Sequence, residues 1–237
     1  MSFLILVRHG QSIWNLEKKF TGWVDVELTE QGKLEAKKAG LLIKKKNIDI
    51  NFYYSSLQLR ANKTLEIIQA ILKDNKNYIK AWELNERHYG SLTGLNKIEM
   101  KKKIGENKVH EFRRSWNSKP EPLNRESPYH PVNIKIYDKI PQDEIPDSES
   151  LKDTYERVIR YYKNQIKKKL VDKNVLISAH GNSIRALCKY LFKLDNNQIT
   201  SLEIPTGNPL TIKFKKEEEI ISCEYLDHER AKDLLIF

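Results

Sequence analysis

The alternation of apolar and polar positions predicts strands and helices in turn. The chain opens with an uninterrupted apolar run, Phe3–Val7, as in a strand that is covered on both faces of a parallel sheet. A helical pattern follows over about residues 29–46, with Thr29 as its N-cap. The side chains expected on its buried face are Leu34 and Leu41 or Leu42.

Two further units repeat this strand-then-helix order. The first combines Ile50–Ser55 with a helix over about Leu57–Lys73, and the second combines Asn174–Ala179 with Ser183–Phe192. A long helix is predicted over residues 150–170, and a strand pair over 210–214 and 220–225. This order predicts an α/β fold, a three-layer α/β/α sandwich around a mostly parallel central sheet.

One stretch, at about residues 116–149, breaks the pattern. It holds six of the eight prolines, and long ordered loops of this kind usually serve as lids or binding loops. We therefore predict a single catalytic domain over residues 1–237, with an irregular insertion at 116–149 that covers the substrate.

Composition narrows the function classes. The 42 Lys and Arg against 32 Asp and Glu give a net charge of +10, which suits anionic ligands. No apolar run approaches the roughly 18 residues of a membrane span, and the N-terminus lacks a secretory pattern, so we expect a cytoplasmic protein without membrane contact. Aromatic residues do not alternate with the lysine runs, which argues against nucleic-acid binding. Cys188 and Cys223 are expected to be reduced thiols.

The strand ends carry the candidate chemistry. Arg8 and His9 follow the first strand, Arg60 lies one turn into the helix after the second, and His180 follows the later strand. Ligands bind outside the carboxyl ends of parallel strands, so adjacent strands would bring these side chains together. Arginine binds phosphate oxygens, glycines such as Gly10 let backbone amides approach an anion, and a neutral histidine accepts a phosphoryl group. The residues indicate phosphoryl transfer without a metal.

The same residues resemble a known family, the cofactor-dependent phosphoglycerate mutases of the histidine phosphatase superfamily. The resemblance begins at residues 6–12, with Trp14 and Asn15, and covers about residues 3–226. The blocks that carry it are 20–23, 25–26, 28–32, 55–57, 60–61 with Thr64, 84–90, 94–97, 113–116, 149–154, 178–183 and 204–207.

The resemblance implies a role for each matching residue. His9 is the phosphorylated nucleophile, Glu86 is the general acid and base, and Arg8, Arg60 and His180 surround the transferring phosphoryl group. The substrate-binding set it implies is Arg8, Gly10, Gln11, Ser12, Asn15, Thr21, Gly22, Arg60, Glu86, Arg87, His88, Tyr89, Lys97, Arg113, Arg114, Gly181 and Asn182. Taken without the resemblance, Glu86 is better explained as an ion-pair partner of Arg87, and Lys97 and the two arginines as surface charges.

The implied reaction interconverts 3-phosphoglycerate and 2-phosphoglycerate through a phosphohistidine and a 2,3-bisphosphoglycerate intermediate, in glycolysis and gluconeogenesis. The cofactor is 2,3-bisphosphoglycerate, which primes His9, and no metal is needed. Relatives form dimers or tetramers, so we expect a homo-oligomer. The alternatives are a bisphosphoglycerate mutase (synthase), against which Ser12 argues, and a broad-specificity histidine phosphatase.

Three features depart from the family pattern. The loop from Arg125 to Pro146 aligns less clearly with the mutases than its surroundings, so no catalytic residue is assigned inside it. Asn208 stands where relatives carry an aliphatic residue, and Asp227–Phe237 stands in place of a longer tail that helps to cover the site mouth. The different tail leaves the closure of the site and the ratio of mutase to phosphatase activity open, and the sequence predicts no effect for Asn208.

Overall fold

The computed structural model describes residues 1–215 and 219–231. In this part of the chain six strands form one sheet with the order β3-β2-β4-β1-β5-β6. Strands β1 to β4 are mutually parallel, and β5 is antiparallel to both of its neighbours. The strands are β1 (Ser2–Arg8), β2 (Phe52–Ser55), β3 (Tyr78–Lys80), β4 (Val175–Ala179), β5 (Leu210–Phe214) and β6 (Ile220–Tyr225).

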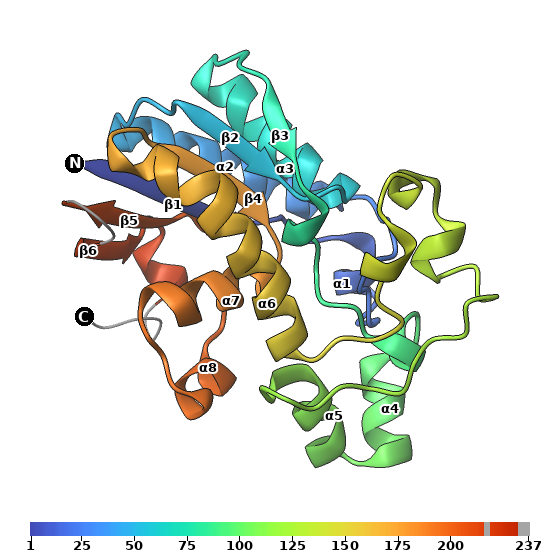
Figure 1. The fold of residues 1–237 in the computed structure, drawn as a ribbon. Helices are drawn as coiled ribbons and strands as arrows, with labels where there is room; N and C mark the ends of the chain where they lie inside the picture. Colours follow the sequence, from blue (N-terminus) through green and yellow to red (C-terminus); the bar gives the residue numbers. More distant parts are fainter. Residues whose placement is uncertain (216–218, 232–237) are drawn as a thin grey trace.

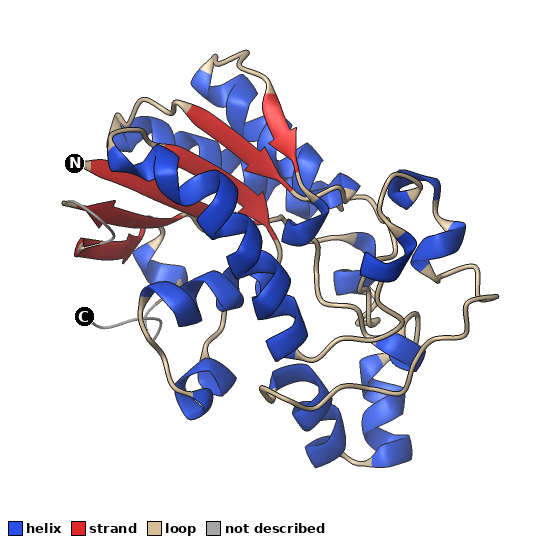
Figure 2. Ribbon diagram, viewed as in Figure 1, coloured by secondary structure: helices blue, strands red, loops and turns tan. Residues whose placement is uncertain are grey.

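Helices cover both faces of this sheet, and a group of small helices lies beyond its carboxyl edge (Figures 1 and 2). The α-helices are α1 (Ile13–Leu16), α2 (Glu30–Lys46), α3 (Leu59–Leu72), α4 (Lys97–Ile104), α5 (Glu106–Arg114), α6 (Leu151–Tyr161), α7 (Gly181–Leu191) and α8 (Asn196–Ser201). Helices α2 and α3 pack on one face and α6 and α7 on the other, which confirms the predicted three-layer sandwich.

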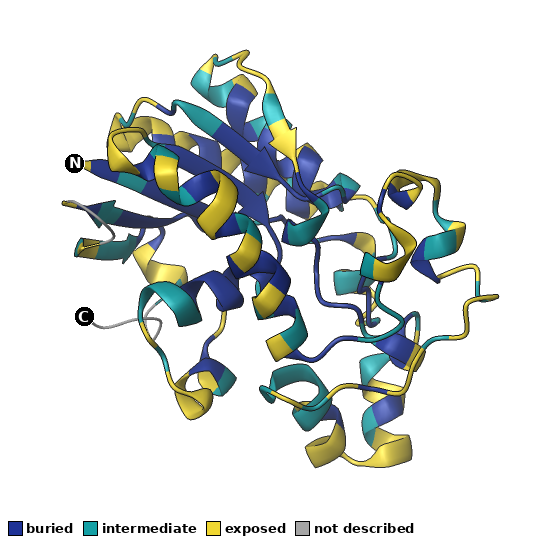
Figure 3. Cartoon of the chain, in the orientation of Figure 1, coloured by how far each residue is buried: buried dark blue, intermediate teal, exposed yellow. Residues whose placement is uncertain are grey.

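The central strands β1, β2, β4 and β5 are mostly buried, whereas the edge strands β3 and β6 are partly exposed (Figure 3). Leu4 and Leu6 of β1 face the core under α6 and α7, whereas Ile5 and Val7 face the core under α2 and α3. Because successive side chains of a strand point to opposite faces, one uninterrupted apolar run supplies both cores. The predicted reading of residues 3–7 is confirmed.

The predicted buried face of α2 is wrong. Leu34 and Leu41 are exposed, and the buried positions are small residues together with Ile43. A Cβ atom at Gly40 would lie 2.9 Å from the Cβ of Ile71, so α2 and α3 approach closely through this glycine. Close helix packing through small residues has replaced the leucine contact that periodicity favours.

The predicted helix over 150–170 is correct only in its first part. The α-helical hydrogen bonding of α6 ends at Tyr161, and a π-helical turn (η6, Tyr162–Ile166) and a 3₁₀ segment (η7, Lys167–Val171) follow. The other 3₁₀ segments are η1 (Trp82–Leu84), η2 (Gly90–Leu92), η3 (Pro131–Asn133), η4 (Lys135–Tyr137), η5 (Gln142–Glu144) and η8 (His228–Arg230). The strand pair β5 and β6 is confirmed, while 216–218 of its turn lie outside the described residues.

The stretch 116–149 is irregular, as predicted, apart from η3 to η5. It packs behind the site segments: Tyr137 donates a 2.5 Å hydrogen bond from its hydroxyl to the Trp23 carbonyl, and Ser91 N donates to Glu121 O at 2.8 Å. Among the described residues that line the active cavity, none belongs to this stretch. The stretch packs against the segments behind the cavity wall, and its role as a substrate cover stays a prediction.

Two other predicted features have structural roles or fall outside the description. Asn208 is fully buried, and its side-chain amide exchanges two hydrogen bonds with the backbone of Asp227, at 2.9 and 3.0 Å. Residues 232–237 of the tail lie outside the described residues.

Cys188 and Cys223 are free thiols. Within the described ranges, no helix is both long and apolar enough to cross a membrane.

Candidate active site

His9 stands at the carboxyl end of β1, and its tautomer is set by the backbone. Its own amide donates to Ala179 O of β4 at 3.0 Å, and its Nδ1 lies 2.7 Å from Gly10 O. Because a carbonyl only accepts hydrogen bonds, Nδ1 carries the proton and Nε2 carries the lone pair. Arg60 Nε lies 3.3 Å from that Nε2 atom. The imidazole is thus fixed with its nucleophilic nitrogen toward a guanidinium.

The surroundings of His9 keep it neutral. Burial lowers its pKa well below the ordinary value of 6.5, and the charges of Arg60 and Arg8 lower it further. The hydrogen bond to Gly10 O opposes this effect only in part. A neutral imidazole retains the lone pair that nucleophilic attack requires.

Two arginines approach His9 from different elements, Arg8 from the end of β1 and Arg60 from the first turn of α3. Arg60 is 1% exposed, and its guanidinium donates to Val24 O at 2.9 Å and to Gly22 O at 3.0 Å. Arg8 donates to Ile204 O at 2.7 Å. In the described residues no carboxylate forms an ion pair with either guanidinium, so both charges remain available to an anion.

His180 lies directly behind His9. Their ring centroids are 5.0 Å apart with the rings edge to face, and His180 Nε2 is 2.7 Å from Ser56 Oγ. Burial lowers its pKa well below 6.5, and Arg60 adds to this effect. His180 Nδ1 has no hydrogen-bond partner among the described residues. Strand adjacency thus brings together the two imidazoles and two guanidiniums that follow β1, β2 and β4.

Glu86 supplies a carboxylate on the opposite wall. Its Oε1 accepts from Arg87 N and Asn182 Nδ2 at 2.8 Å each, and from Asn182 N at 3.2 Å. Its backbone is also fixed: the amide donates to Gln58 Oε1 at 2.9 Å, and the carbonyl accepts from Arg157 at 3.0 Å. The alternative reading of Glu86 as an ion-pair partner of the Arg87 side chain is wrong, because only the Arg87 backbone amide reaches it.

Arg157 and Glu149 form a buried ion pair beneath this wall. Arg157 Nε and Nη2 lie 2.6 and 2.9 Å from the two carboxylate oxygens of Glu149. The Arg157 side chain is 6% exposed and the Glu149 side chain 4%. Arg157 also donates to the carbonyls of Glu83, Asn85 and Glu86. One guanidinium therefore holds the loop that carries Glu86.

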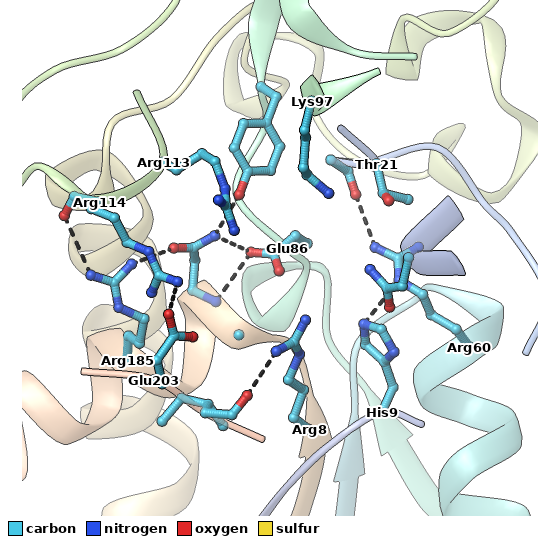
Figure 4. A pocket seen from close by; sticks show the side chains of 16 residues that line it. Arg8, His9, Thr21, Arg60, Glu86, Lys97, Arg113, Arg114, Arg185 and Glu203 are labelled. Carbon is cyan, nitrogen blue, oxygen red and sulfur yellow. Dashed lines mark hydrogen bonds and ion pairs between the residues drawn. The ribbon is translucent and has the colours of Figure 1, made fainter. Parts of the chain in front are cut away.

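The side chains line a polar cavity that is open at its mouth (Figure 4). Helices α4 and α5 provide Lys97, Arg113 and Arg114 on the wall facing His9. Burial lowers the pKa of Lys97 to about 8. Within the described lining, six cationic side chains face two carboxylates, Glu86 and Glu203. The cavity is built for a small ligand with several negative charges.

Comparison with known proteins identifies the family. The sequence profile of the histidine phosphatase superfamily (branch 1) matches residues 4–132 and 126–224. The chain belongs to the histidine phosphatase superfamily. Three relatives are called 2,3-bisphosphoglycerate-dependent phosphoglycerate mutase. The one from Pelagibacter ubique is 66% identical over all of both chains. Those from Hydrogenobaculum sp. and Hamiltonella defensa are 46% and 44% identical, over 98% and 94% of this chain and 94% and 90% of theirs.

Solved structures support the fold of this histidine phosphatase. A mycobacterial glucosyl-3-phosphoglycerate phosphatase superposes with a TM-score of 0.66 at 22% identity, covering 89% of this chain and 92% of its own. Mycobacterial hydrolase 1 superposes with a TM-score of 0.68 at 19% identity, covering 94% and 96%. The predicted resemblance to phosphoglycerate mutases and the predicted fold are both confirmed.

Most of the residues singled out in the sequence come together in the cavity of this histidine phosphatase. Those that line it are Arg8, His9, Asn15, Thr21, Gly22, Arg60, Glu86, Tyr89, Lys97, Arg113, Arg114, Gly181 and Asn182. The lining does not include Gly10, Gln11, Ser12, Arg87, His88 or His180, although His180 contacts the nucleophile.

The residues outside the lining have structural contacts instead. Gln11 donates from its amide to Glu35 and pairs its side chain with Thr29, while Ser12 caps α1. Arg87 is fully buried and donates to a carbonyl of α5, and His88 accepts from Gly90 N on the far side of the loop. A side chain at Gly10 would collide with the Gly32 backbone. The sequence resemblance alone did not separate these supports from the cavity wall.

Three lining residues were not singled out in the sequence: Arg185, Glu203 and Ile204. Arg185 follows His180 on the same helix as Asn182, and Glu203 and Ile204 precede the loop that enters β5. In the sequence, Arg185 resembles an ordinary charged residue of a helix surface, and Glu203 and Ile204 resemble ordinary residues that flank a strand. In the described residues no group of three or more His, Cys, Asp or Glu could hold a metal ion.

Proposed function

We propose that this protein is a phosphoglycerate mutase that interconverts 3-phosphoglycerate and 2-phosphoglycerate through phosphorylated His9. The observation that carries the proposal is the tautomer of His9: Nδ1 is bound to a carbonyl, and Nε2 faces a cationic cavity that also holds a carboxylate. The full-length similarity to the Pelagibacter ubique mutase supports the same substrate pair.

His9 and Glu86 share the chemical step. When phosphorylated, His9 gives its phosphoryl group to the free hydroxyl of the substrate: the P–N bond breaks, a P–O bond forms, and Glu86 takes the hydroxyl proton. In the return step the Nε2 lone pair attacks the other phosphoryl group, and Glu86 gives its proton to the departing oxygen. The second carboxylate oxygen of Glu86, Oε2, has no hydrogen-bond partner among the described residues. It is the oxygen that accepts and returns the proton.

The cations stabilise the transferred group and hold the rest of the ligand. Arg8 and Arg60 flank His9 and stabilise the equatorial oxygens, where negative charge collects. Lys97, Arg113 and Arg114 bind the carboxylate and the phosphate that is not in transfer. The same walls permit the substrate to be held in both orientations, because cations face it from opposite sides.

The residues also fit 2,3-bisphosphoglycerate as the primer. Two lining side chains, Arg8 and Thr21, carry buried polar atoms without a partner in the described structure, Nε and Oγ1, as expected of groups that await ligand oxygens. The primer, when bound, supplies the phosphoryl group that charges His9. Arg8, Arg60 and Lys97 are the cations that would hold it.

We propose further that the enzyme needs no metal, acts in the cytoplasm in glycolysis and gluconeogenesis, and forms a homo-oligomer without binding nucleic acid or membranes. The support is the cationic cavity, which neutralises phosphate without a divalent ion. The family resemblance supports the remaining points.

An enolase-coupled assay on 3-phosphoglycerate, with and without 2,3-bisphosphoglycerate, tests this function. The expected result is isomerisation that the primer stimulates and that His9→Ala abolishes. Because enolase needs Mg²⁺, the effect of EDTA is measured without enolase, by following 2-phosphoglycerate directly with phosphorus NMR, and isomerisation should be unchanged. Release of inorganic phosphate without isomerisation would instead identify a phosphatase, and net release of bisphosphate would identify a synthase.

A further inference from the structure

Arg185 is a buried guanidinium that the proposed reaction does not use. It is 2% exposed and lies on α7, three residues after Asn182. Within the described residues no carboxylate is at ion-pair distance. The Nη atoms of Arg185 donate to neutral oxygens, Asn182 Oδ1 at 2.9 Å, Arg114 O at 3.3 Å and Ile199 O, and its Nε has no hydrogen-bond partner among the described residues. A buried charge without a counter-ion is costly, so its presence calls for a role beyond packing.

The bond to Asn182 fixes which way that amide points. A guanidinium only donates hydrogen bonds, so the atom of Asn182 that faces Arg185 must be Oδ1. The Nδ2 group is then turned to the opposite side, where it donates to Glu86 Oε1 at 2.8 Å and to the Tyr89 hydroxyl at 3.2 Å. Figure 4 labels Arg185 and Glu86, the two ends of this chain of hydrogen bonds.

The opposite orientation of the Asn182 side-chain amide would be unfavourable beside Glu86. With Oδ1 facing Glu86, an amide oxygen would lie against a carboxylate oxygen and the donor to Oε1 would be lost. Oε1 would keep only the two backbone amides of Arg87 and Asn182. The position of the carboxyl that exchanges a proton with the substrate therefore depends on a residue that does not touch it.

The other two bonds of Arg185 act on a different wall. Its Nη2 donates to Arg114 O at the end of α5 and to Ile199 O of α8. Arg114 lines the cavity and pairs with Glu203. One side chain thus connects the helix that carries Asn182 with the helix that carries the substrate-binding arginines.

We propose that Arg185 is a positioning residue with two separable effects: through Asn182 it orients Glu86 for proton transfer, and through the end of α5 it sets the substrate-binding arginines. The inference rests on the proposed mutase function. It assigns the first effect to kcat and the second to KM.

The test is a cycle of variants in the enolase-coupled assay: Arg185→Met, Arg185→Lys, Asn182→Ala and the double variant. Arg185→Met should lower kcat by on the order of 10²-fold, the loss seen when an active-site hydrogen bond is removed. In the Asn182→Ala background the same change should lower kcat by less than about threefold, because the bond it acts through is already gone. KM should rise about equally in both backgrounds.

The conservative variant separates geometry from charge. Arg185→Lys keeps the positive charge, but a single ammonium group cannot bond Asn182, Arg114 and Ile199 together as a guanidinium does. Its kcat should therefore fall about as much as that of Arg185→Met. Loss of a donor to the Glu86 carboxylate should also move the acidic limb of the kcat profile to higher pH. Lys189→Met removes one charge from the same helix outside the cavity and should leave kcat, KM and the pH profile unchanged.

A second readout does not need activity. The Asn182 side-chain NH₂ signal, assigned by its loss in Asn182→Ala, should shift in the proton–nitrogen NMR spectrum of Arg185→Lys and stay in place in Lys189→Met. Additive kcat losses in the cycle, or an unmoved Asn182 signal in a folded Arg185→Lys protein, would overturn the inference. Absence of mutase activity in the unmodified enzyme would refute the proposed function, and the NMR result would still decide the role of Arg185.

Discussion

The buried ion pair between Glu149 and Arg157 is predicted to hold the Glu86 loop, and Glu149→Gln tests it. Glu149 accepts two hydrogen bonds from Arg157, at 2.6 and 2.9 Å, and a third from His88 N at 2.8 Å. Glutamine keeps the shape, but it removes the charge and turns one of the two oxygens into a donor. At least one of these three donors is then left without an acceptor in the core.

The expected cost follows from the burial of both partners, which are 4% and 6% exposed. Removing one member of a buried pair costs about 3–5 kcal/mol, because the remaining charge stays buried without compensation. For a chain of this size, each kcal/mol corresponds to about 2–4 °C in Tm, so we expect a decrease of roughly 6–20 °C. Because Arg157 also binds the Glu86 carbonyl, kcat should fall as well.

Urea unfolding followed by circular dichroism measures the free-energy change, and the coupled assay measures kcat. The matched control is Glu144→Gln, which breaks an exposed pair with Arg160 and should cost less than about 1 kcal/mol. The double variant Glu149→Leu with Arg157→Met should recover part of the stability, since it leaves no buried charge unpaired. A Glu149→Gln protein within about 1 kcal/mol of the unmodified one would refute this reasoning.

Three other predictions concern stability. Lowering the pH from 7 to 5 should reduce the free energy of unfolding, because burial lowers the pKa of His88 to about 3 while the unfolded chain takes up that proton near pH 6.5. Each such histidine contributes up to about 1.4 kcal/mol per pH unit, and His88→Phe should flatten the slope in urea titrations. Gly10→Ala should prevent folding or abolish phosphorylation of His9, measured by circular dichroism and radiolabelling, because its Cβ collides with Gly32. Asn208→Leu should lower the unfolding free energy by about 1–3 kcal/mol in urea, because it leaves the buried Asp227 backbone groups unpaired.

The sequence predicts the strands and the strand-end residues well for a physical reason. A run such as Phe3–Val7 has few alternatives to a buried strand, and parallel strands bring Arg8, His9 and His180 to the same edge. Periodicity fails on α2, where Gly40 permits close packing on α3 and Leu34 is left in solvent. A hydropathy pattern contains no information on how closely the backbones of two helices pack.

The supports of the site are beyond local sequence reasoning. Arg185 and Arg157 lie on helices with charged neighbours, and only the tertiary structure shows that each guanidinium is buried against backbone carbonyls. The sequence does not distinguish Arg87 from Arg113, yet Arg87 is buried behind the cavity wall and Arg113 lines the cavity. Such differences depend on contacts between residues far apart in the chain.

Brief reaction with labelled 2,3-bisphosphoglycerate, followed by mapping of the phosphorylated atom, tests whether His9 is the nucleophile. Because Nδ1 of His9 is bound to Gly10 O, we expect one phosphoryl group per chain, on His9 Nε2, detected by mass spectrometry and phosphorus–proton NMR. His9→Asn should take up no label. Phosphorylation of His180, phosphorylation of Nδ1, or a fully active enzyme without label would show that His9 Nε2 is not the nucleophile.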